Sequence, residues 1–250
     1  GITPPEFAHM PLLRDEKKAK ISKRKSPWAR LTWFREQGYL PEALVNFLAL
    51  QGYPPILEAD GSEREVFTFD EFAERFDWAK VNPAGSMFNL DKLDWLNGVW
   101  IRSLPVGEFA SRLLPFLEGA GILSDNPSLG ELARLKQIAE LIQTRIVKLT
   151  DALGLVAPFY LGDDAIEIAA DARATLDARS AEVLDAALDA LGDIDDHGTG
   201  VLGADSGWNA AGIEQVLREA IVTGLGVKPK VAFGPLRTAV SGQRISPPLF

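Results

Sequence analysis

The sequence has 250 residues, 46% of them apolar and 24% charged, so it is long enough to bury a sizeable core and to hold more than one domain. No apolar run reaches the roughly 18 to 20 residues of a membrane span, and the start GITPPEF lacks the basic-then-apolar order of a signal peptide, so we expect a soluble, cytoplasmic protein. The lack of cysteine excludes disulfides and cysteine-ligated metals, and because His9 and His197 have no ligand spacing we expect no metal site.

Charge is distributed unevenly along the chain. The formal net charge is -9, yet the segment from Arg14 to Arg35 is strongly basic and the segment from Asp151 to Asp196 is strongly acidic. The last fifty residues are mildly basic again. We therefore expect an anionic partner to meet the two ends of the chain and not its acidic middle.

Helical periodicity dominates, and no alternating run is long enough to predict a convincing sheet, so we expect a mainly α fold. The first clear helix begins at Pro41 and stops at Gly52. Its apolar face is predicted to bury Leu44, Phe47 and Leu48. A short helix should follow the capping-box pair Thr68 and Glu71.

Two further helices are predicted after residue 89. Their apolar stripes are Leu93, Leu96 and Trp100 in the first, and Phe109, Leu113 and Leu117 in the second. Pro115 lies inside the second pattern and should kink or end that helix.

A long helix is predicted over residues 128–149. It opens with a second capping box, Ser128 and Glu131. One apolar stripe then runs through Leu132, Leu135, Ala139, Ile142, Ile146 and Leu149. Beside it, a ridge at helical spacing contains Arg134, Leu141, Arg145 and Lys148 and ends in two positive charges. These charges are explained equally well as ordinary solvated surface residues.

The remaining helices flank a loop. Leu184, Ala187, Leu188 and Leu191 predict a helix before Gly192, and Asn209 should cap another that carries Ile213, Val216, Leu217 and Ile221. Between them, Gly198, Gly200 and Gly203 have the spacing of a dinucleotide fingerprint, but no strand precedes them, so we predict a loop and not a nucleotide site. We expect the acidic pairs Asp163–Asp164 and Asp195–Asp196 to lie in exposed turns without catalytic roles.

The basic segment contains a recognisable signature. Lys20-Ile21-Ser22-Lys23-Arg24 resembles the "KMSKS" motif of class I aminoacyl-tRNA synthetases. The flanking stretches FAHMPLLR, SPWARLTWFREQGYLPEALVNFLALQGYP and FTFDEFAERFDWAKVNPAGSMFNLDKLDWLNG resemble the glutamyl-tRNA synthetase family through the first hundred residues. The later chain is similar through its helix order and the stretches GVKPKVAFGPLRTAVSG and SPPLF.

The resemblance implies a chemistry for the signature. Enzymes of this family activate glutamate with ATP, assisted by Mg²⁺, and transfer it to tRNA. Lys20 and Lys23 would neutralise charge that builds up on the ATP phosphates in the transition state. Ser22 would fix the loop by hydrogen bonding and would also contact the ATP phosphates. Arg24 and Lys25 would hold tRNA phosphates.

The resemblance also implies a domain order. Residues 1–24 would be the end of the catalytic domain, 25–105 a stem-contact helical domain, and 106–250 an all-helical anticodon-binding region with subdomains 106–158 and 159–250. No "HIGH"-like segment or parallel-sheet pattern occurs, so we expect the Rossmann catalytic domain to be absent from this chain. The chain resembles the C-terminal portion of such an enzyme and should not aminoacylate or hold a cofactor by itself.

The resemblance further implies anticodon contacts. Arg145 falls where the family reads the last anticodon base, and Arg237, Ser246 and Pro247 fall where it holds the first and middle bases. The alternative for Arg145 is a surface arginine that pairs with an acid on a neighbouring helix. The expected partner is the glutamate acceptor tRNA, with ATP and glutamate in the complete enzyme and no membrane, and we expect a monomer.

A second hypothesis is a helical interaction module, related to such a synthetase, that binds a protein partner through its apolar and acidic faces. The two hypotheses differ in salt dependence. Binding of tRNA should fall steeply with salt because phosphate counterions are released, whereas a module that binds only protein should not bind tRNA.

Overall fold

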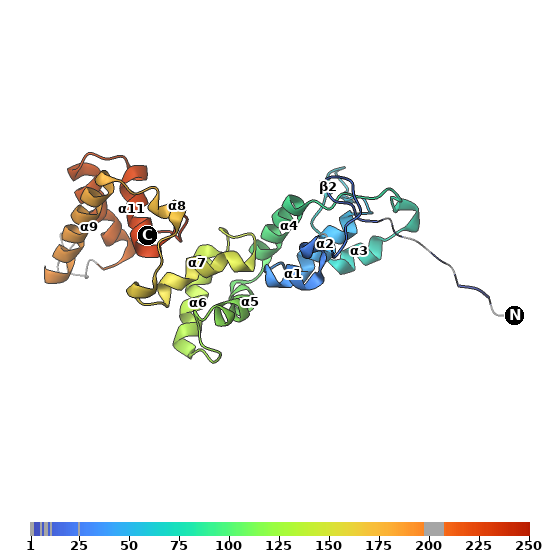
Figure 1. Cartoon of the computed structure of the whole chain (residues 1–250), viewed down its shortest axis with the longest axis horizontal. Coiled ribbons are helices and arrows are strands. Elements are labelled where there is room, and N and C mark those ends of the chain that lie inside the picture. Colours follow the sequence, from blue (N-terminus) through green and yellow to red (C-terminus); the bar gives the residue numbers. More distant parts are fainter. Residues whose placement is uncertain (1–2, 6, 8–9, 11, 25, 198–207) are drawn as a thin grey trace. The chain divides into compact units, whose positions relative to one another are not determined.

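A computed structural model describes residues 3–5, 7, 10, 12–24, 26–197 and 208–250. The described part is mostly helical, which confirms the expectation of a mainly α chain (Figure 1). Its strands form one short antiparallel pair in which Ile56 lies opposite Arg64. The chain divides into two compact units. Unit 1 comprises residues 1–113 and 143–151, and unit 2 comprises residues 114–142 and 152–250.

Unit 1 is built on two packed helices, α2 (Pro41–Leu50) and α4 (Leu90–Ser103). Its other elements are η1 (Pro27–Ala29), α1 (Leu31–Glu36), β1 (Ile56–Leu57), β2 (Glu63–Arg64), α3 (Phe69–Arg75), η2 (Trp78–Lys80), η3 (Leu149–Asp151) and the first half of α5 (Val106–Gly119).

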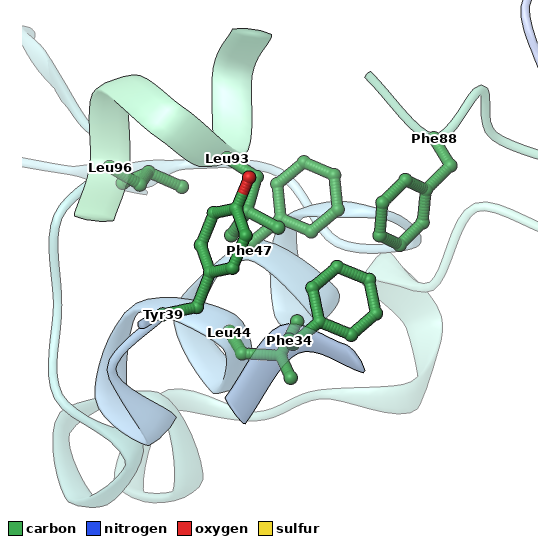
Figure 2. Close-up of a cluster of buried hydrophobic side chains, with 7 residues drawn as sticks. All are labelled: Phe34, Tyr39, Leu44, Phe47, Phe88, Leu93 and Leu96. Atoms are coloured by element: carbon green, nitrogen blue, oxygen red, sulfur yellow. The ribbon is translucent and has the colours of Figure 1, made fainter. Parts of the chain in front are cut away.

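An aromatic core holds unit 1 together (Figure 2). The rings of Phe47 and Phe88 meet edge to face with centroids 4.8 Å apart, and Trp28 packs on Phe88 at 5.1 Å. Leu93 and Leu96 of α4 are fully buried in the same cluster. Such aromatic contacts add stabilisation beyond the area that they bury.

The predictions for the helices of unit 1 hold with one exception. Pro41 is the first residue of α2, and the reciprocal capping box of Thr68 and Glu71 opens α3. Phe47 is fully buried, but the expectation that Leu48 is buried is wrong, because its exposed fraction is 43%. The residue that completes the buried face is Ala43, one turn earlier.

Unit 2 has its own core. Its elements are the end of α5, α6 (Leu129–Ile142), α7 (Ala152–Val156), η4 (Ala157–Phe159), η5 (Asp163–Ala165), α8 (Ala170–Arg173), α9 (Ala178–His197), α10 (Ala210–Leu217), the π-helical η6 (Arg218–Gly224) and α11 (Pro229–Ser241). Val183 and Ala187 of α9 pack with Leu217, Ile221 and Phe233. As predicted, Asn209 caps α10 by accepting a hydrogen bond from the Gly212 backbone N–H at 3.0 Å.

Two helix boundaries differ from the prediction. The helix predicted over 128–149 ends at Ile142, whereas the apolar period continues to Leu149. At Pro115, where the sequence predicts a kink or an end, the helix does not end, because α5 continues to Gly119.

The second difference is that α9 continues beyond Gly192 to His197. Asp195 and Asp196 are therefore helical and do not form a turn. Leu188, predicted on the apolar face, is 69% exposed, and Val183 is buried instead. Gly198, Gly200 and Gly203 lie outside the described residues.

Candidate nucleic-acid interface

The basic segment near the start forms a tight hairpin. The Asp15 backbone N–H donates to the Ala19 carbonyl at 2.9 Å, and the Asp15 carboxylate accepts from the Ala19 N–H at 2.8 Å. Lys18 adopts the left-handed conformation, φ 61°, which this turn requires. Arg14 then pairs with Lys20 on one side and Met87 on the other. The hairpin is thus attached to the segment that leads into α4.

The signature residues divide into a buried anchor and exposed cations. Ile21 is half-buried and packs against the aromatic core of unit 1, and Ser22 is also half-buried. Lys20, Lys23 and Arg24 are exposed, and within the described ranges none of the three forms an ion pair. The end of the hairpin and the turn after it therefore present positive charge to solvent, next to an anchored Ile21. Lys25 lies outside the described residues.

Arg145 lies in a turn between α6 and η3, and not on a helix as predicted. The cause is Gln143, whose side-chain amide donates to the carbonyls of Ile101 and Leu104 at the end of α4, both at 2.8 Å. These bonds fix the chain where a further helical turn would have continued. Arg145 is exposed and, in the part that the structure describes, pairs with no acid, so the alternative ion-pair interpretation finds no support.

The turn 143–151 is clamped by a buried amide, Asn97 of α4. Asn97 Oδ1 accepts from the Leu40 N–H at 2.8 Å, and Nδ2 donates to the Val147 carbonyl at 2.5 Å. Gly38 completes the clamp by accepting from the Leu149 N–H at 3.0 Å. With φ +82° and no room for a Cβ, 2.7 Å from the Leu149 nitrogen, Gly38 must be glycine.

An ion pair supports the same turn. Lys148 Nζ lies 3.5 Å from Asp94 Oδ2 of α4, and the Tyr39 hydroxyl donates to the Asp94 carboxylate. Burial, with a smaller contribution from Asp94, raises the pKa of the Tyr39 hydroxyl well above its ordinary value, so it remains a proton donor. Sequence reasoning missed Asn97 and Asp94, although Asn97 directly follows Leu96 on the apolar stripe, where a polar residue signals a buried hydrogen-bonding role.

In unit 2, the structure brings Arg237, Ser246 and Pro247 together. Arg237 Nη1 donates to Ser246 Oγ at 3.3 Å and to the Pro247 carbonyl at 3.4 Å, and Ser246 Oγ donates to that carbonyl at 2.8 Å. The three residues line a hollow of about 110 Å³, together with Pro158 and Phe159. Ser246 is only 3% exposed.

Comparisons with known proteins place these features in a family. The family model "tRNA synthetases class I (E and Q), catalytic domain" matches residues 1–95, and the model "Anticodon binding domain" matches residues 108–250. The chain is 49% identical over 251 residues to the glutamate–tRNA ligase of Acidothermus cellulolyticus. This chain belongs to the glutamate–tRNA ligase family.

Other glutamate–tRNA ligases agree with this assignment. The enzyme of Cutibacterium acnes is 41% identical over 254 residues. Both alignments cover 100% of this chain but only 47% and 48% of the relatives, so the chain spans about half the length of the curated relatives it matches.

Solved glutamate–tRNA ligase structures share the fold. The ligase from Elizabethkingia meningosepticum, in complex with its amino acid, superposes with a TM-score of 0.70 at 22% identity and covers 98% of this chain and 47% of that chain. The synthetase from Elizabethkingia anophelis gives a TM-score of 0.64 at 22% identity and covers 99% of this chain and 47% of that chain.

The catalytic-domain model of the ligase family extends to residue 95, beyond the hairpin and over much of unit 1. The predicted boundaries at residues 24 and 105 stay predictions. Among the described residues no helix is long and apolar enough to cross a membrane.

Proposed function

We propose that this chain is the tRNA-binding part of a glutamate–tRNA ligase, which joins glutamate to its tRNA through a glutamyl-adenylate. The observation that carries the proposal is the end of the pinned hairpin and the turn after it, where Lys20, Lys23 and Arg24 are exposed and, in the described ranges, without ion pairs. Cations that are held in place but not neutralised suit an anionic ligand. The match of residues 108–250 to an anticodon-binding domain supports the same partner.

The proposed chemistry of the hairpin is the one that the family resemblance implies. When the glutamate carboxylate attacks the α-phosphorus of ATP, negative charge accumulates on the phosphates and on the departing pyrophosphate. The ammonium groups of Lys20 and Lys23 would stabilise that charge most strongly in the transition state. Because Ile21 packs against the core, the backbone that carries the neighbouring lysines would already be held before ATP arrives, and Ser22 would assist at the phosphates.

Other requirements of the reaction are not met by the described residues. They contain no parallel sheet of the Rossmann type, and no group of three or more His, Cys, Asp or Glu side chains is placed to hold a metal ion. We therefore assign no Mg²⁺ ligands here and propose that ATP, Mg²⁺ and glutamate are bound by the complete enzyme. This chain by itself would bind tRNA without aminoacylating it.

The proposed tRNA contacts lie in both units. Arg24 and Lys25 would hold stem phosphates, and Arg145 would read the last anticodon base from its clamped turn. The hollow lined by Arg237, Ser246 and Pro247 would receive the first and middle anticodon bases. Unpaired bases are commonly splayed out and recognised in this way by flat or rigid side chains. Cytoplasmic location and a monomeric state stay predictions.

The experiment that tests the proposal is tRNA binding as a function of salt. We expect the logarithm of the association constant to fall linearly with the logarithm of salt concentration, with a slope of about -2 to -4 if three to five phosphates are contacted. Replacing Lys20, Lys23 and Arg24 together by glutamine should make that slope shallower. If the chain does not bind tRNA, the proposal is wrong.

One observation favours a protein partner as the second candidate. Unit 1 has an apolar hollow of about 450 Å³, lined by Pro41, Val45, Phe69 and Trp100 among others, and Phe69 is 63% exposed. A protein-interaction module would use such a surface and would show no tRNA binding in the salt experiment.

A further inference from the structure

The loop at residues 242–247, which follows α11, extends the proposed anticodon site. We propose that Arg244 and Ile245, at the tip of this loop, contact the anticodon loop of bound tRNA: Arg244 at a phosphate, and Ile245 against the face of a base or ribose. This inference rests on the proposed function, and it assigns to the rim of the site two residues that the family resemblance did not point to.

The first end of the loop is fixed by Gly242. Its N–H donates to the Thr238 carbonyl at 2.9 Å, and its carbonyl accepts from the Ala169 N–H at 2.8 Å. Gly242 has φ +67°, and a Cβ at this position would lie 2.4 Å from the Glu167 carbonyl oxygen. Only glycine allows this close approach, so the loop leaves α11 in one direction.

The second end is fixed by the network around Arg237. The Ser246 hydroxyl accepts from Arg237 and donates to the Pro247 carbonyl, and that carbonyl also accepts from Arg237. Ser246 and Pro247 are both buried. The polar groups at this end are therefore already engaged within the chain, so Ser246 and Pro247 form a wall of the hollow and set the course of the loop.

The tip between these two ends is exposed. Ile245 has an exposed fraction of 67%, and Arg244 is exposed and forms no ion pair within the described residues. Three other arginines of unit 2 are engaged: Arg179 with Glu182, Arg218 with Glu214, and Arg134 with the Phe159 carbonyl. Arg244 is thus an available guanidinium, two residues before Ser246 in the wall of the hollow.

A single-stranded RNA loop matches this tip chemically. Its phosphates attract a guanidinium, and its bases and riboses offer flat apolar faces to an aliphatic side chain. Because both ends of the protein loop are already fixed, binding would not have to order its backbone, and less of the contact energy would be lost.

The test compares Arg244→Gln with Lys230→Gln in the whole chain. Lys230 is an exposed cation in the first turn of the same helix, α11, whose 13 residues separate it from the loop by about 18 Å. The probe is a transcribed tRNA with the glutamate anticodon, titrated at several salt concentrations. Circular dichroism and thermal unfolding verify that each variant folds.

We expect Arg244→Gln to weaken binding about fivefold at 0.1 M salt and to make the salt slope shallower by about 0.7, the contribution of one single-strand phosphate contact. Arg244→Lys should restore most of the slope. Ile245→Ser should weaken binding several-fold without changing the slope, because no charge is removed. Lys230→Gln should change neither quantity appreciably.

The outcomes separate this inference from the proposed function. If the unaltered chain binds tRNA with a steep salt dependence but Arg244→Gln behaves like Lys230→Gln, the inference is overturned and the proposed function stands. If the unaltered chain does not bind tRNA, both are overturned.

Discussion

Replacing Arg145 tests whether this residue recognises a base or only attracts phosphates. The residue is exposed, and Gln143 and Asn97 hold its backbone in place. We expect Arg145→Gln to reduce discrimination at the third anticodon base by about 1 to 3 kcal/mol, the value of one bidentate base contact. The measurement is the affinity for tRNA variants that differ only at that base. Lys80→Gln removes another exposed cation of unit 1 and should leave the discrimination unchanged. Equal losses for all base variants in Arg145→Gln would contradict the prediction.

Asn97 is the residue on which the position of that turn depends. Replacing it by leucine, which has a similar volume, would leave the buried Leu40 N–H and the part-buried Val147 carbonyl without these partners. At about 1 to 3 kcal/mol for each unsatisfied group, we expect the free energy of unfolding to fall by about 3 kcal/mol in urea titrations. Asn82→Ala, which removes only an exposed bond to the Ala84 N–H, is the matched control. A similar small loss in both variants would show that the buried amide is not needed.

At the scale of elements, an ion pair joins α2 to α5. Arg112 binds both carboxylate oxygens of Glu42, at 2.6 and 2.9 Å, and this bond lowers the pKa of Glu42 below its ordinary 4.5. A lowered pKa stabilises the folded state above pH 4.5, and the stabilisation is lost as the pH falls through the folded-state pKa. Because both side chains are partly exposed, we expect a contribution of about 0.5 to 1 kcal/mol.

Glu42→Gln should therefore lower the thermal unfolding temperature near neutral pH and make it fall less on acidification than in the unaltered chain. Thermal unfolding measured from about pH 7 to pH 3 gives the comparison. Glu74→Gln, at an exposed acid without an ion pair in the described ranges, should retain the full dependence on pH. Parallel curves for the unaltered chain and Glu42→Gln would refute this role of the pair.

Helix starts could be predicted from the sequence more reliably than helix ends. Thr68, Ser128 and Asn209 act through bonds to residues three positions away, so a short stretch of sequence contains the whole signal. The end of α6 depends instead on Gln143 binding carbonyls of Ile101 and Leu104, some forty residues earlier. The apolar period did not indicate this end, because Ile146 in the turn and Leu149 at the start of η3 are buried as completely as they would be in a continued helix.

The candidate site shows the same division. The signature at Lys20 to Arg24 could be recognised because its residues are contiguous, and the structure adds that Ile21 is the anchor. The grouping of Arg237 with Ser246 and Pro247 was implied only by resemblance, since their hydrogen bonds depend on the loop that Gly242 starts. The turn that carries Arg145 is held by hydrogen bonds from Asn97 to Val147 and from Leu149 to Gly38. Because these residues are far apart in the sequence, no local pattern predicts the bonds.

At the scale of the whole molecule, a chain of formal net charge -9 is proposed to bind a polyanion. This is consistent because charges separated by more than a Debye length, about 10 Å at 0.1 M salt, act almost independently. The cations of Lys20 to Arg24 and of Arg244 can then attract phosphates locally, while the acids of α9 contribute little. The balance depends on salt, since the Debye length grows to about 30 Å at 0.01 M.

We therefore expect the double-logarithmic plot of tRNA affinity against salt to be linear above about 0.1 M and to flatten toward 0.01 M, where repulsion from the acidic region reaches the RNA. Asp185→Asn combined with Asp189→Asn, both exposed on α9, should extend the linear range toward lower salt and leave affinity above 0.1 M almost unchanged. Fluorescence anisotropy with labelled tRNA covers this range. A plot that is straight down to 0.01 M would mean that the acidic region does not repel the RNA even at low salt. An equal shift by the double substitution at all salt concentrations would mean that net charge and not local charge governs binding.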